Sequence, residues 1–560
     1  MTDATTDSID AKSGLVLAAD GTPLKKSLRR ALRAQKMKAL LLIAPLLLFV
    51  LISFIFPIGQ MLWRSVENDI VADTLPDTVQ RLASIELAEG DLPPEDVFEA
   101  MYFDMFLAAE AKAHTRLGSR LNYEESGMSS LFRQSGRKLG DLGKDLQKQL
   151  RAVDPDWSDS AAWFELMSGA PDAPRADDLT AQAARRVAKL IDKPVRARDG
   201  FAASQEIADL LPLTARIYTE MALFMQVEDG DDVASKKPWE AIYVALMRDL
   251  ETADVAGYSG PRAAMLQAAA SAEIEGTPIN FTETFAEIDK DWVASGTWRT
   301  IQTYASRVTP GYFLNAVDAR LTPDGFELQP ENKRVLLTLF QRTLIMSMII
   351  MFSCILLGYP VAWLLANLPS RKANVLMILV LLPFWTSLLV RTSAWKVMLQ
   401  QQGVVNDFLV WIGLVDDANR LIMMNNQTGT IIAMTHILLP FMILPMYSVM
   451  QTIPPTYLRA AKSLGATNWT AFWRVYFPQT IPGIGAGSIL VFILSIGYYI
   501  TPEIVGGTKG VFISNRIAYH ISSSLNWGLA AALGTILLAV VLGLYWCYDK
   551  IVGIDNVKLG

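Results

Sequence analysis

The sequence predicts an all-α membrane protein with six transmembrane helices and one large, mostly helical insertion between the first two. Three observations lead to this fold class: six long apolar segments, basic residues gathered in short loops, and a 66–330 stretch with the composition of a water-soluble domain. Hydrophobic residues make up 51% of the 560 residues, and a chain of this length exceeds one ordinary domain.

The six apolar segments are the expected transmembrane spans. A helix needs about 20 predominantly apolar residues to cross the hydrocarbon core of a bilayer. Six segments meet or approach this length: 40–63, 335–360, 374–396, 429–451, 482–502 and 528–548. The first is longer than the apolar region of a signal peptide, and no A-x-A cleavage site follows it, so we expect an uncleaved span.

Basic residues predict the orientation of these spans. Short loops rich in Lys and Arg remain in the cytoplasm. Such residues precede the first span and follow the second, fourth and sixth, so six alternating spans place them all on one side, with both termini inside. The residues are Lys25, Lys26, Arg29, Arg30, Arg33, Lys36, Lys38, Arg371, Lys372, Arg459, Lys462, Arg474, Lys550 and Lys558.

The segment between the first two spans is expected outside the membrane as a folded domain. Residues 67–330 carry a formal charge of about −19 and the rest about +13, which together give the net charge of −6. Helical patterns occur at 108–121 and 179–192, and turn residues separate them at 91–96 and 168–178. The expected organisation is a basic tail at 1–38, a first helix at 39–65, the insertion at 66–330, a five-helix core at 331–550 with a loop at 453–480, and a tail at 551–560.

Residue types that carry chemistry are scarce. Cys354 and Cys547 lie in separate apolar runs, so we expect core thiols rather than a disulfide or metal site. His114 has no Cys or His cluster around it. No GxxxxGK[ST] phosphate loop, HExxH, GxSxG or CxxC pattern is present, so we expect neither an enzyme nor an ATPase in this chain, and no bound cofactor.

One polar stretch interrupts the apolar half of the chain. It reads YLRAAKSLGATNWTAFWRVYFP and runs from Tyr457 to Pro478. Two prolines end the preceding span, 456–464 has room for two helical turns, and Gly465 suits the left-handed residue that ends a helix. Thr467 or Asn468 then suits the cap of a second short helix, which Pro478 is expected to close. The sequence therefore predicts a cytoplasmic helix–turn–helix.

This stretch resembles the EAA loop of binding-protein-dependent ABC import permeases, whose pattern is E-A-A, three residues, G, nine residues, I-x-L-P. Ala460, Ala461, Gly465 and Pro478 match in register. Arg459 stands where Glu is usual, which leaves open any ion pair that this Glu makes. An interfacial amphipathic loop without a partner is the alternative interpretation.

The resemblance extends over about 331–550. The segments GYPVAWLLANLP (358–369), LLPFWTSLLVRTSAWKVML (381–399), GVVNDFLVWIGL (403–414), ILLPFMILPMYSVM (437–450) and YYITPEIVGG (498–507) are similar to the spermidine/putrescine and opine permease branch. FPIGQMLWRS (56–65) in the first span also fits. The insertion at 66–290 does not match the compact permeases of that branch.

The resemblance implies a permease subunit of the type I ABC importer fold in the bacterial cytoplasmic (inner) membrane. It implies a second permease, a cytoplasmic ABC ATPase dimer that binds ATP and Mg²⁺, and an extracytoplasmic solute-binding protein. Nucleic acid is not an expected partner, and the basic tail suits anionic lipid. The residues implied in ATPase coupling are Arg459, Ala460, Ala461, Leu464, Gly465 and Pro478.

Polar and aromatic residues near the spans are candidates for the translocation path. Glu503 is positioned to attract a cationic solute, and Trp385, Tyr498 and Tyr499 to offer aromatic faces to an ammonium group. The alternative is a loop carboxylate with interfacial aromatic anchors. Arg391 is expected either to pair with Glu503 or to extend its side chain to the membrane interface.

His436 is a candidate for a proton-linked group in transport. The simpler interpretation is that it forms a hydrogen bond between two helices.

Two other functions fit parts of the sequence. The insertion suits a membrane receptor or scaffold with an extracytoplasmic sensing domain. An ATP-independent transporter is the third hypothesis, although no internal repeat supports it. The leading substrate is a polyamine, implied by the resemblance and by the acidic insertion, with opines and other small organic solutes as alternatives.

Overall fold

The computed structural model describes residues 24–196, 200–228 and 230–552, and the chain divides into two units, 1–64 and 65–560. The first unit contains α1 (Leu24–Val50), the π-helical turn η1 (Leu51–Ile55) and α2 (Phe56–Arg64). Its membrane-crossing portion spans Gln35–Arg64. The helix begins well before the predicted start of the span, so residues 24–38 continue the helix, and residues 1–23 of the predicted tail lie outside the described residues.

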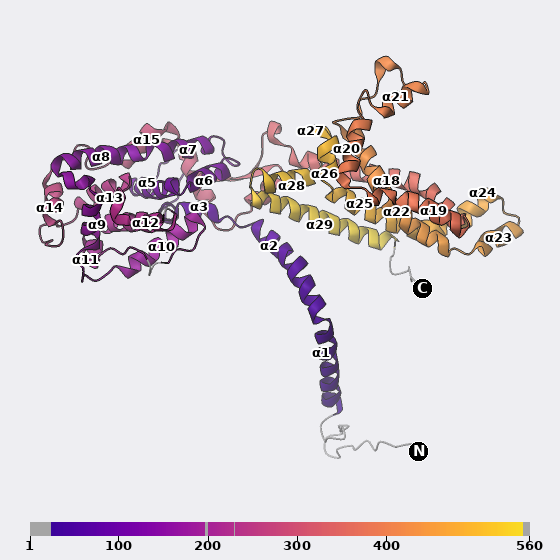
Figure 1. Ribbon diagram of the computed structural model, residues 1–560, viewed down its shortest axis with the longest axis horizontal. Helices are drawn as coiled ribbons and strands as arrows, with labels where there is room; N and C mark the ends of the chain where they lie inside the picture. The colour runs from indigo at the N-terminus through magenta and orange to yellow at the C-terminus, as the bar shows by residue number, and fades with distance from the viewer. Residues whose placement is uncertain (1–23, 197–199, 229, 553–560) are drawn as a thin grey trace. The chain divides into compact units, whose positions relative to one another are not determined.

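The insertion is helical, as predicted (Figure 1). Its helices are α3 (Asp69–Thr74), α4 (Pro76–Leu82), α5 (Glu95–Glu110), α6 (Ala113–Leu121), α7 (Met128–Lys138), α8 (Gly140–Val153), α9 (Ser160–Ser168), α10 (Asp177–Ile191), α11 (Gln205–Leu210), α12 (Pro212–Glu228), α13 (Glu240–Leu250), α14 (Ala263–Ser271), α15 (Phe281–Ile288), α16 (Ser295–Thr303) and α17 (Gly311–Ala316). A short antiparallel hairpin follows, β1 (Ala319–Thr322) and β2 (Gly325–Leu328), which the sequence did not predict.

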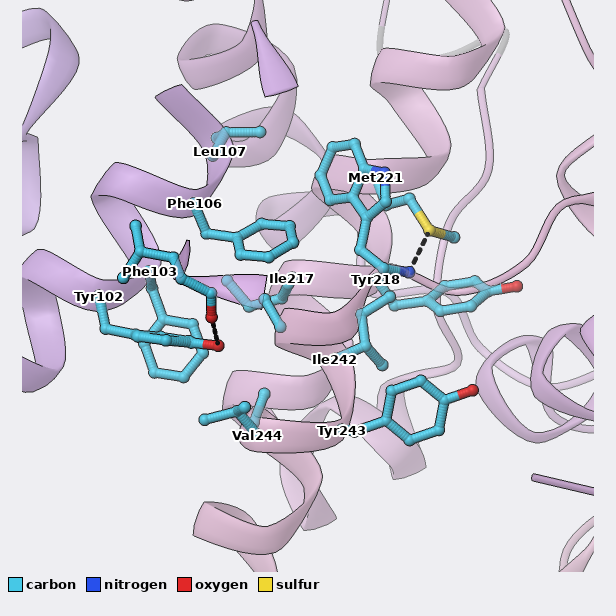
Figure 2. Close-up of a cluster of buried hydrophobic side chains, with 14 of the residues drawn as sticks. Tyr102, Phe103, Phe106, Leu107, Ile217, Tyr218, Met221, Ile242, Tyr243 and Val244 are labelled. Atoms are coloured by element: carbon cyan, nitrogen blue, oxygen red, sulfur yellow. Dashed lines mark hydrogen bonds between the residues drawn. The ribbon is translucent and has the colours of Figure 1, made fainter. Parts of the chain in front are cut away.

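Three helices, α5, α12 and α13, build the core of the insertion (Figure 2). They are buried on nearly all sides, as a helix must be when it is apolar around its circumference. Tyr102 is fully buried, and its hydroxyl donates to the Leu139 carbonyl oxygen at 3.1 Å. The insertion therefore has its own hydrophobic core.

An ionic network around Arg186 fastens α10 to its neighbours. The guanidinium donates to Asp77 of α4 at 2.8 Å and to Asp104 of α5, and lies 3.5 Å from Glu220 of α12. Asp104 and Glu220 are almost fully buried. Burial opposes ionisation of Asp77, yet Arg186 and Arg216 lower its pKa from 3.8 to about 2. The charges therefore stabilise one another in a partly buried site.

One predicted helix in the insertion is interrupted. The 108–121 segment breaks at Lys112, which adopts a left-handed conformation with φ of 55°, so α5 and α6 are separate helices. Lys112 is the N-cap residue of α6, and its side chain makes no capping hydrogen bond. The Ala-rich pattern of the sequence does not predict this break. The helix predicted at 179–192 is confirmed as α10.

The second half of the chain contains the remaining long apolar helices. In Figure 1, they include α18, α22, α25 and α29. The elements are α18 (Leu336–Asn367), α19 (Ser370–Leu381), η7 (Leu382–Trp385), α20 (Leu388–Met398), α21 (Val404–Trp411), α22 (Gln427–Thr452), α23 (Pro455–Ser463), α24 (Asn468–Ala471), η9 (Phe472–Tyr476), α25 (Phe477–Gly497), α26 (Ile500–Val505), α27 (Gly507–Gly510), α28 (Ile513–Ser522) and α29 (Trp527–Val552). Part of the predicted 551–560 tail thus continues α29, and 553–560 lies outside the described residues.

Glycines allow α25 to pack directly on α22. A Cβ atom at Gly487 would lie 2.7 Å from Met442 Sδ and 3.1 Å from its carbonyl oxygen. One at Gly483 would lie 3.1 Å from Met446 Cα. The glycine spacing of four residues places both on the same face of α25, which is how small residues bring membrane helices together.

Two predicted spans differ from the structure. The third, 374–396, is bent by 94° between α19–η7 and α20. Pro383 lies in η7, and the Ser387 side chain caps α20 by accepting from the Val390 amide at 3.3 Å, so the helix restarts in a new direction. The described chain has five unbroken spans, or six if the bent pair is counted as one. The fifth ends at Gly497 rather than at 502, where the backbone bends before α26.

The cysteine prediction holds for one residue only. Cys354 is buried between α18 and α22, and its thiol faces the Thr435 carbonyl oxygen at 3.6 Å. Cys547 is exposed on α29, where no other helix of the described chain covers it. The apolar run around Cys547 therefore faces outward instead of into a core.

The Arg186 network predicts a large stability effect. Arg186→Met should destabilise the insertion by about 3 to 5 kcal/mol, because it leaves buried carboxylates without their counter-charge. Lys144→Met is the control, since the Lys144–Asp141 pair is exposed and contributes at most about 1 kcal/mol. Limited proteolysis of the full-length protein in denaturant would measure both. Equal protease resistance of the two variants would contradict the role given to the network.

Candidate coupling loop and membrane polar cluster

The loop after α22 begins with a short helix, as predicted. Pro454 caps α23, and Pro455 occupies its first position, where the missing amide hydrogen costs nothing. Helix α23 ends at Ser463, one residue before the predicted end. Leu458, on its inner side, packs against the membrane core.

Gly465 ends α23 in a left-handed turn, which confirms its predicted conformation. Its φ is 89°, a value that suits glycine. The Ala466 amide donates to the Ala461 carbonyl oxygen at 3.0 Å, and the Gly465 amide donates to that of Lys462 at 3.0 Å. This pair of bonds is the Schellman arrangement. The glycine therefore sets the direction in which the chain leaves the helix.

Thr467 restarts the helix, and Pro478 does not end it. The Thr467 hydroxyl accepts from the Thr470 amide at 3.2 Å, so Thr467 is the cap of α24. Helix α24 continues through the π-helical turn η9 into α25, and this continuous helix runs from Asn468 to Gly497. The prediction that Pro478 closes a short helix is wrong, because Pro478 lies in the first turn of α25, where proline is tolerated.

An aromatic cluster holds the base of the loop. The Phe472 ring contacts those of Tyr476 and Phe477, with ring centres 5.9 and 6.4 Å apart. Tyr359 of α18 packs against Phe472 and Phe477 at 6.3 and 5.9 Å. The loop is therefore anchored to the packed helices at its base.

The outer side of the loop is open. Arg459, Ala460 and Gly465 are exposed, and the Leu464 side chain is 89% exposed. The outer side of the loop therefore presents one exposed apolar side chain beside two small residues. Arg459, at the position where the EAA pattern has Glu, makes no ion pair within the described part of the chain.

A second group of residues lies where α20, α22 and α26 meet. Thr392 and Thr501 are fully buried, and their hydroxyl oxygens lie 3.2 Å apart. Trp395 Nε1 donates to His436 Nδ1 at 3.1 Å, which confirms the interhelical hydrogen bond for that histidine. His436 Nδ1 is thus the acceptor, and the neutral ring carries its proton on Nε2.

Arg391 and Glu503 flank this group without meeting. The Arg391 Nε is buried and has no hydrogen-bond partner among the described residues. Glu503 is exposed, and its Oε2 accepts from Asn515 Nδ2 at 2.6 Å. The suggested Arg391–Glu503 pair does not occur in the described structure.

The aromatic candidates lie at two different places. Trp385, in η7, is 73% exposed. Tyr498 and Tyr499 form the bend between α25 and α26, and Tyr499 accepts from Asn515 through its backbone at 2.8 Å. Asn515, Thr392 and Thr501 were not predicted, because single amide and hydroxyl residues in an apolar sequence give no signal before their helices are packed.

The remaining candidate, His114, lies apart from other metal-ligating side chains in the described residues. Within residues 24–196, 200–228 and 230–552, no three His, Cys, Asp or Glu side chains are grouped to hold a metal ion. His114 is buried, and its Nδ1 lies 3.3 Å from the Ala108 carbonyl oxygen.

Comparison with known proteins identifies the family. The family model described as "Binding-protein-dependent transport system inner membrane component" matches residues 343–552. The insertion lies outside this match.

Curated relatives match less than half of the chain. The spermidine/putrescine transport system permease protein PotB of Escherichia coli (strain K12) is 37% identical over 204 residues, which are 36% of this chain and 74% of that protein. PotB of Haemophilus influenzae is 36% identical over 212 residues, 37% and 73% of the two chains. The inner membrane ABC transporter permease protein YdcU of E. coli is 31% identical over 264 residues, 45% and 80% of the two chains.

A solved bacterial alginate ABC transporter in complex with its pentasaccharide-bound periplasmic protein is similar at 20% identity and a TM-score of 0.32, over 39% of this chain and 77% of that chain.

The family match and the curated relatives favour neither the receptor hypothesis nor the hypothesis of an ATP-independent transporter. The chain belongs to the inner membrane components of binding-protein-dependent transport systems, as the permease subunit of an ABC importer in the branch of the spermidine/putrescine permeases.

Proposed function

We propose that this permease forms the path by which a polyamine enters the cell, driven by a separate ATPase. The observation that carries the proposal is the 37% identity to permeases named for spermidine and putrescine. The acidic insertion agrees with a cationic solute, because its charge attracts cations to the outer surface.

The exposed face of α23 is the proposed contact with the ATPase. Ala460 and Gly465 give a smooth surface and Leu464 fills a groove of the partner. Closure of an ATP- and Mg²⁺-loaded ATPase dimer then pushes the loop, and the aromatic base carries the movement into α25 and α18. No cofactor is bound by the permease itself in this scheme.

The scheme requires three partners: a second permease, an ATPase dimer and an extracytoplasmic solute-binding protein. It also requires both termini and α23 in the cytoplasm and the insertion outside. Orientation follows from the basic loops. The insertion is proposed to receive the binding protein or to concentrate the solute.

Within the membrane, Glu503 and the Tyr498–Tyr499 bend are the proposed solute contacts. A carboxylate and two aromatic rings suit an ammonium group. Arg391 lies nearby and would repel a second positive charge, which favours one ammonium group at this site at a time.

Purification of the chain from its native membrane in mild detergent tests the assignment of partners. Mass spectrometry should find an ATPase and a second permease in the complex. Isolation of this chain alone, in a detergent that preserves related complexes, would contradict the importer assembly.

A bulky residue at the turn should separate transport from ATP hydrolysis. Gly465→Trp should abolish ATP-driven uptake in proteoliposomes, because it obstructs the docking face. Gly90→Trp is the matched control: both glycines have a left-handed φ, 89° and 94°, and open space around the Cβ position. Each replacement costs about 1 to 2 kcal/mol in backbone strain. Uptake at the full rate by Gly465→Trp would exclude this docking face.

Neutralising Glu503 should weaken solute recognition. Glu503→Gln keeps the acceptor for Asn515 but removes the charge, so the KM for spermidine uptake should rise by up to about fivefold, because an exposed ion pair contributes about 1 kcal/mol or less. Asp417→Asn, an exposed carboxylate in the 403–426 segment, is the control. An unchanged KM in Glu503→Gln would remove this residue from the path.

Removal of the insertion tests its role. Asn68 and Arg307 are adjacent, since the Asn68 amide donates to the Arg307 carbonyl oxygen at 2.9 Å, so residues 69–307 are removable with a short linker. The deletion should raise the KM of uptake at low ionic strength and lose part of that effect in high salt. Uptake equal to that of the intact chain at both salt concentrations would exclude docking and charge attraction alike.

A further inference from the structure

The β1–β2 hairpin has an apolar side that the insertion covers only in part. Ala319 pairs with Leu328, and Leu321 pairs with Phe326, so these four side chains lie on one side of the hairpin. Ala319 is buried, and Leu321 packs against the core of the insertion. In the outer strand β2, Phe326 is 77% exposed and Leu328 is 63% exposed. The apolar side of β2 is therefore uncovered in the described chain.

The opposite side of the hairpin is polar and is closed by ion pairs. Arg320 lies across from Glu327, and their side chains are paired at 3.2 Å. Asp324, in the turn, is paired with Arg299 of α16 at 2.6 Å. The hairpin is thus amphipathic, with its charges neutralised by the insertion and its outer apolar side chains left free.

The Asp318 residue holds the hairpin beside the first turn of α18. It directly precedes β1, and its carboxylate accepts from the amides of residues 335–337 at 3.2, 3.0 and 2.8 Å. Its carbonyl oxygen accepts from the amide of Gln329, the residue after β2, at 2.9 Å. The hairpin cannot leave the start of α18 without breaking these bonds, so its height above the membrane is that of the α18 N-terminus.

The lipid-facing side of α18 begins at this first turn. Leu337, Ile345, Met348 and Phe352 are exposed, and their spacing places them along one side of the helix. Further down this helix, the same kind of side chain faces the acyl chains of the bilayer. The exposed apolar residues of β2 are therefore next to a surface that already contacts lipid.

The charges of α18 show how deep this first turn lies. Residues 343–367 contain no charged side chain, and as a helix they are about 37 Å long, somewhat more than the ~30 Å of the hydrocarbon core. Arg342 therefore marks the headgroup layer. The helix begins six residues earlier, about 9 Å further out, so the hairpin is held at the outer edge of that layer.

Basic residues between the hairpin and α18 fit lipid phosphate. Lys333 and Arg334 are exposed, and Glu331 beside them leaves one net positive charge. Lys333 Nζ donates to Ser126 Oγ at 2.9 Å, and Arg334 donates to the Gln329 carbonyl oxygen, but neither makes an ion pair in the described chain. Exposed apolar side chains beside uncompensated basic residues are typical of segments that lie in a membrane interface.

We propose that the β1–β2 hairpin is a membrane anchor of the insertion. Phe326 and Leu328 enter the leaflet from which the insertion projects, and Lys333 and Arg334 bind the phosphates of its lipids. Together with Asp318, this contact fixes the insertion at one height and in one orientation over the bilayer. The inference concerns the insertion alone and does not depend on which solute is transported.

Benzoylphenylalanine at position 326 tests the contact, because light couples this side chain to whatever lies against it. The full-length chain is placed in vesicles of phosphatidylethanolamine and phosphatidylglycerol. Position 326 should form a phospholipid adduct, which mass spectrometry of the hairpin peptide detects. Val153, a 39% exposed apolar residue at the end of α8, is the control position and should form none. Equal lipid adducts at both positions, or none at either, would overturn the anchor.

The two neighbours of the strand test which side of the hairpin meets lipid. Position 328 should give the same adduct as 326, because both side chains lie on the apolar side. Position 327 should give much less, because Glu327 points to the opposite side. This alternation also shows that the labelled hairpin keeps its strand structure. Equal yields at 327 and 328 would overturn the assignment of the apolar side.

Substitution of the basic residues tests the contact with phosphate. Lys333→Gln with Arg334→Gln should lower the share of phosphatidylglycerol among the adducts at 326, by up to about fivefold for each basic residue lost. Lys144→Gln with Lys148→Gln, two exposed lysines of α8, is the matched control and should leave that share unchanged. An unchanged share in the hairpin variant at low ionic strength would overturn the role given to Lys333 and Arg334.

A protein partner is the competing occupant of this surface. The same photoreactive residue is therefore placed at position 326 in native membranes, where every subunit of the complex is present. Lipid adducts there support the anchor. Adducts to a second permease or to a solute-binding protein in place of lipid would overturn it and assign the hairpin to a protein interface.

Discussion

Three hydrogen bonds to Asp318 join the end of the insertion to the first turn of α18, with which the permease core begins. The Asp318 carboxylate is buried and accepts from three backbone amides at the start of α18. These amides have no partner within the helix, and a membrane span that begins without one leaves them unsatisfied. The Asp318 side chain, which belongs to the insertion, therefore caps the first helix of the permease core.

A second set of contacts reinforces this junction. Tyr312 of α17 packs directly over Gly528 of α29, where any Cβ would overlap the tyrosine ring. Arg120 donates to the Tyr312 hydroxyl at 2.9 Å, and its guanidinium lies 4.4 Å from the ring centre. Helices α18 and α29 are thus tied to the insertion at separate points. The exit of the insertion is therefore fixed to the core by side-chain contacts and not only by the connecting chain.

The permease core follows a different physical rule. In lipid, helices gain little from hydrophobic burial against each other, so close backbone approach and hydrogen bonds hold them together. Gly483 and Gly487 provide the approach of α25 to α22, and the Trp395–His436 bond joins α20 to α22. The proposed coupling loop projects from this packed unit with Leu464 uncovered, whereas its aromatic base is enclosed. In the proposed scheme, the exposed face meets the ATPase and the packed aromatic base carries the movement into the helices.

Local properties of the chain were enough to predict the apolar spans, the helical nature of the insertion, and the Ala460–Gly465–Thr467 turn, because each depends on hydrophobic length, helical periodicity or the backbone freedom of one glycine. The 94° bend in the third span, the continuation of the helix past Pro478, and the junction at Asp318 became visible only in the folded chain. These features depend on packing and on bonds between residues far apart in the sequence.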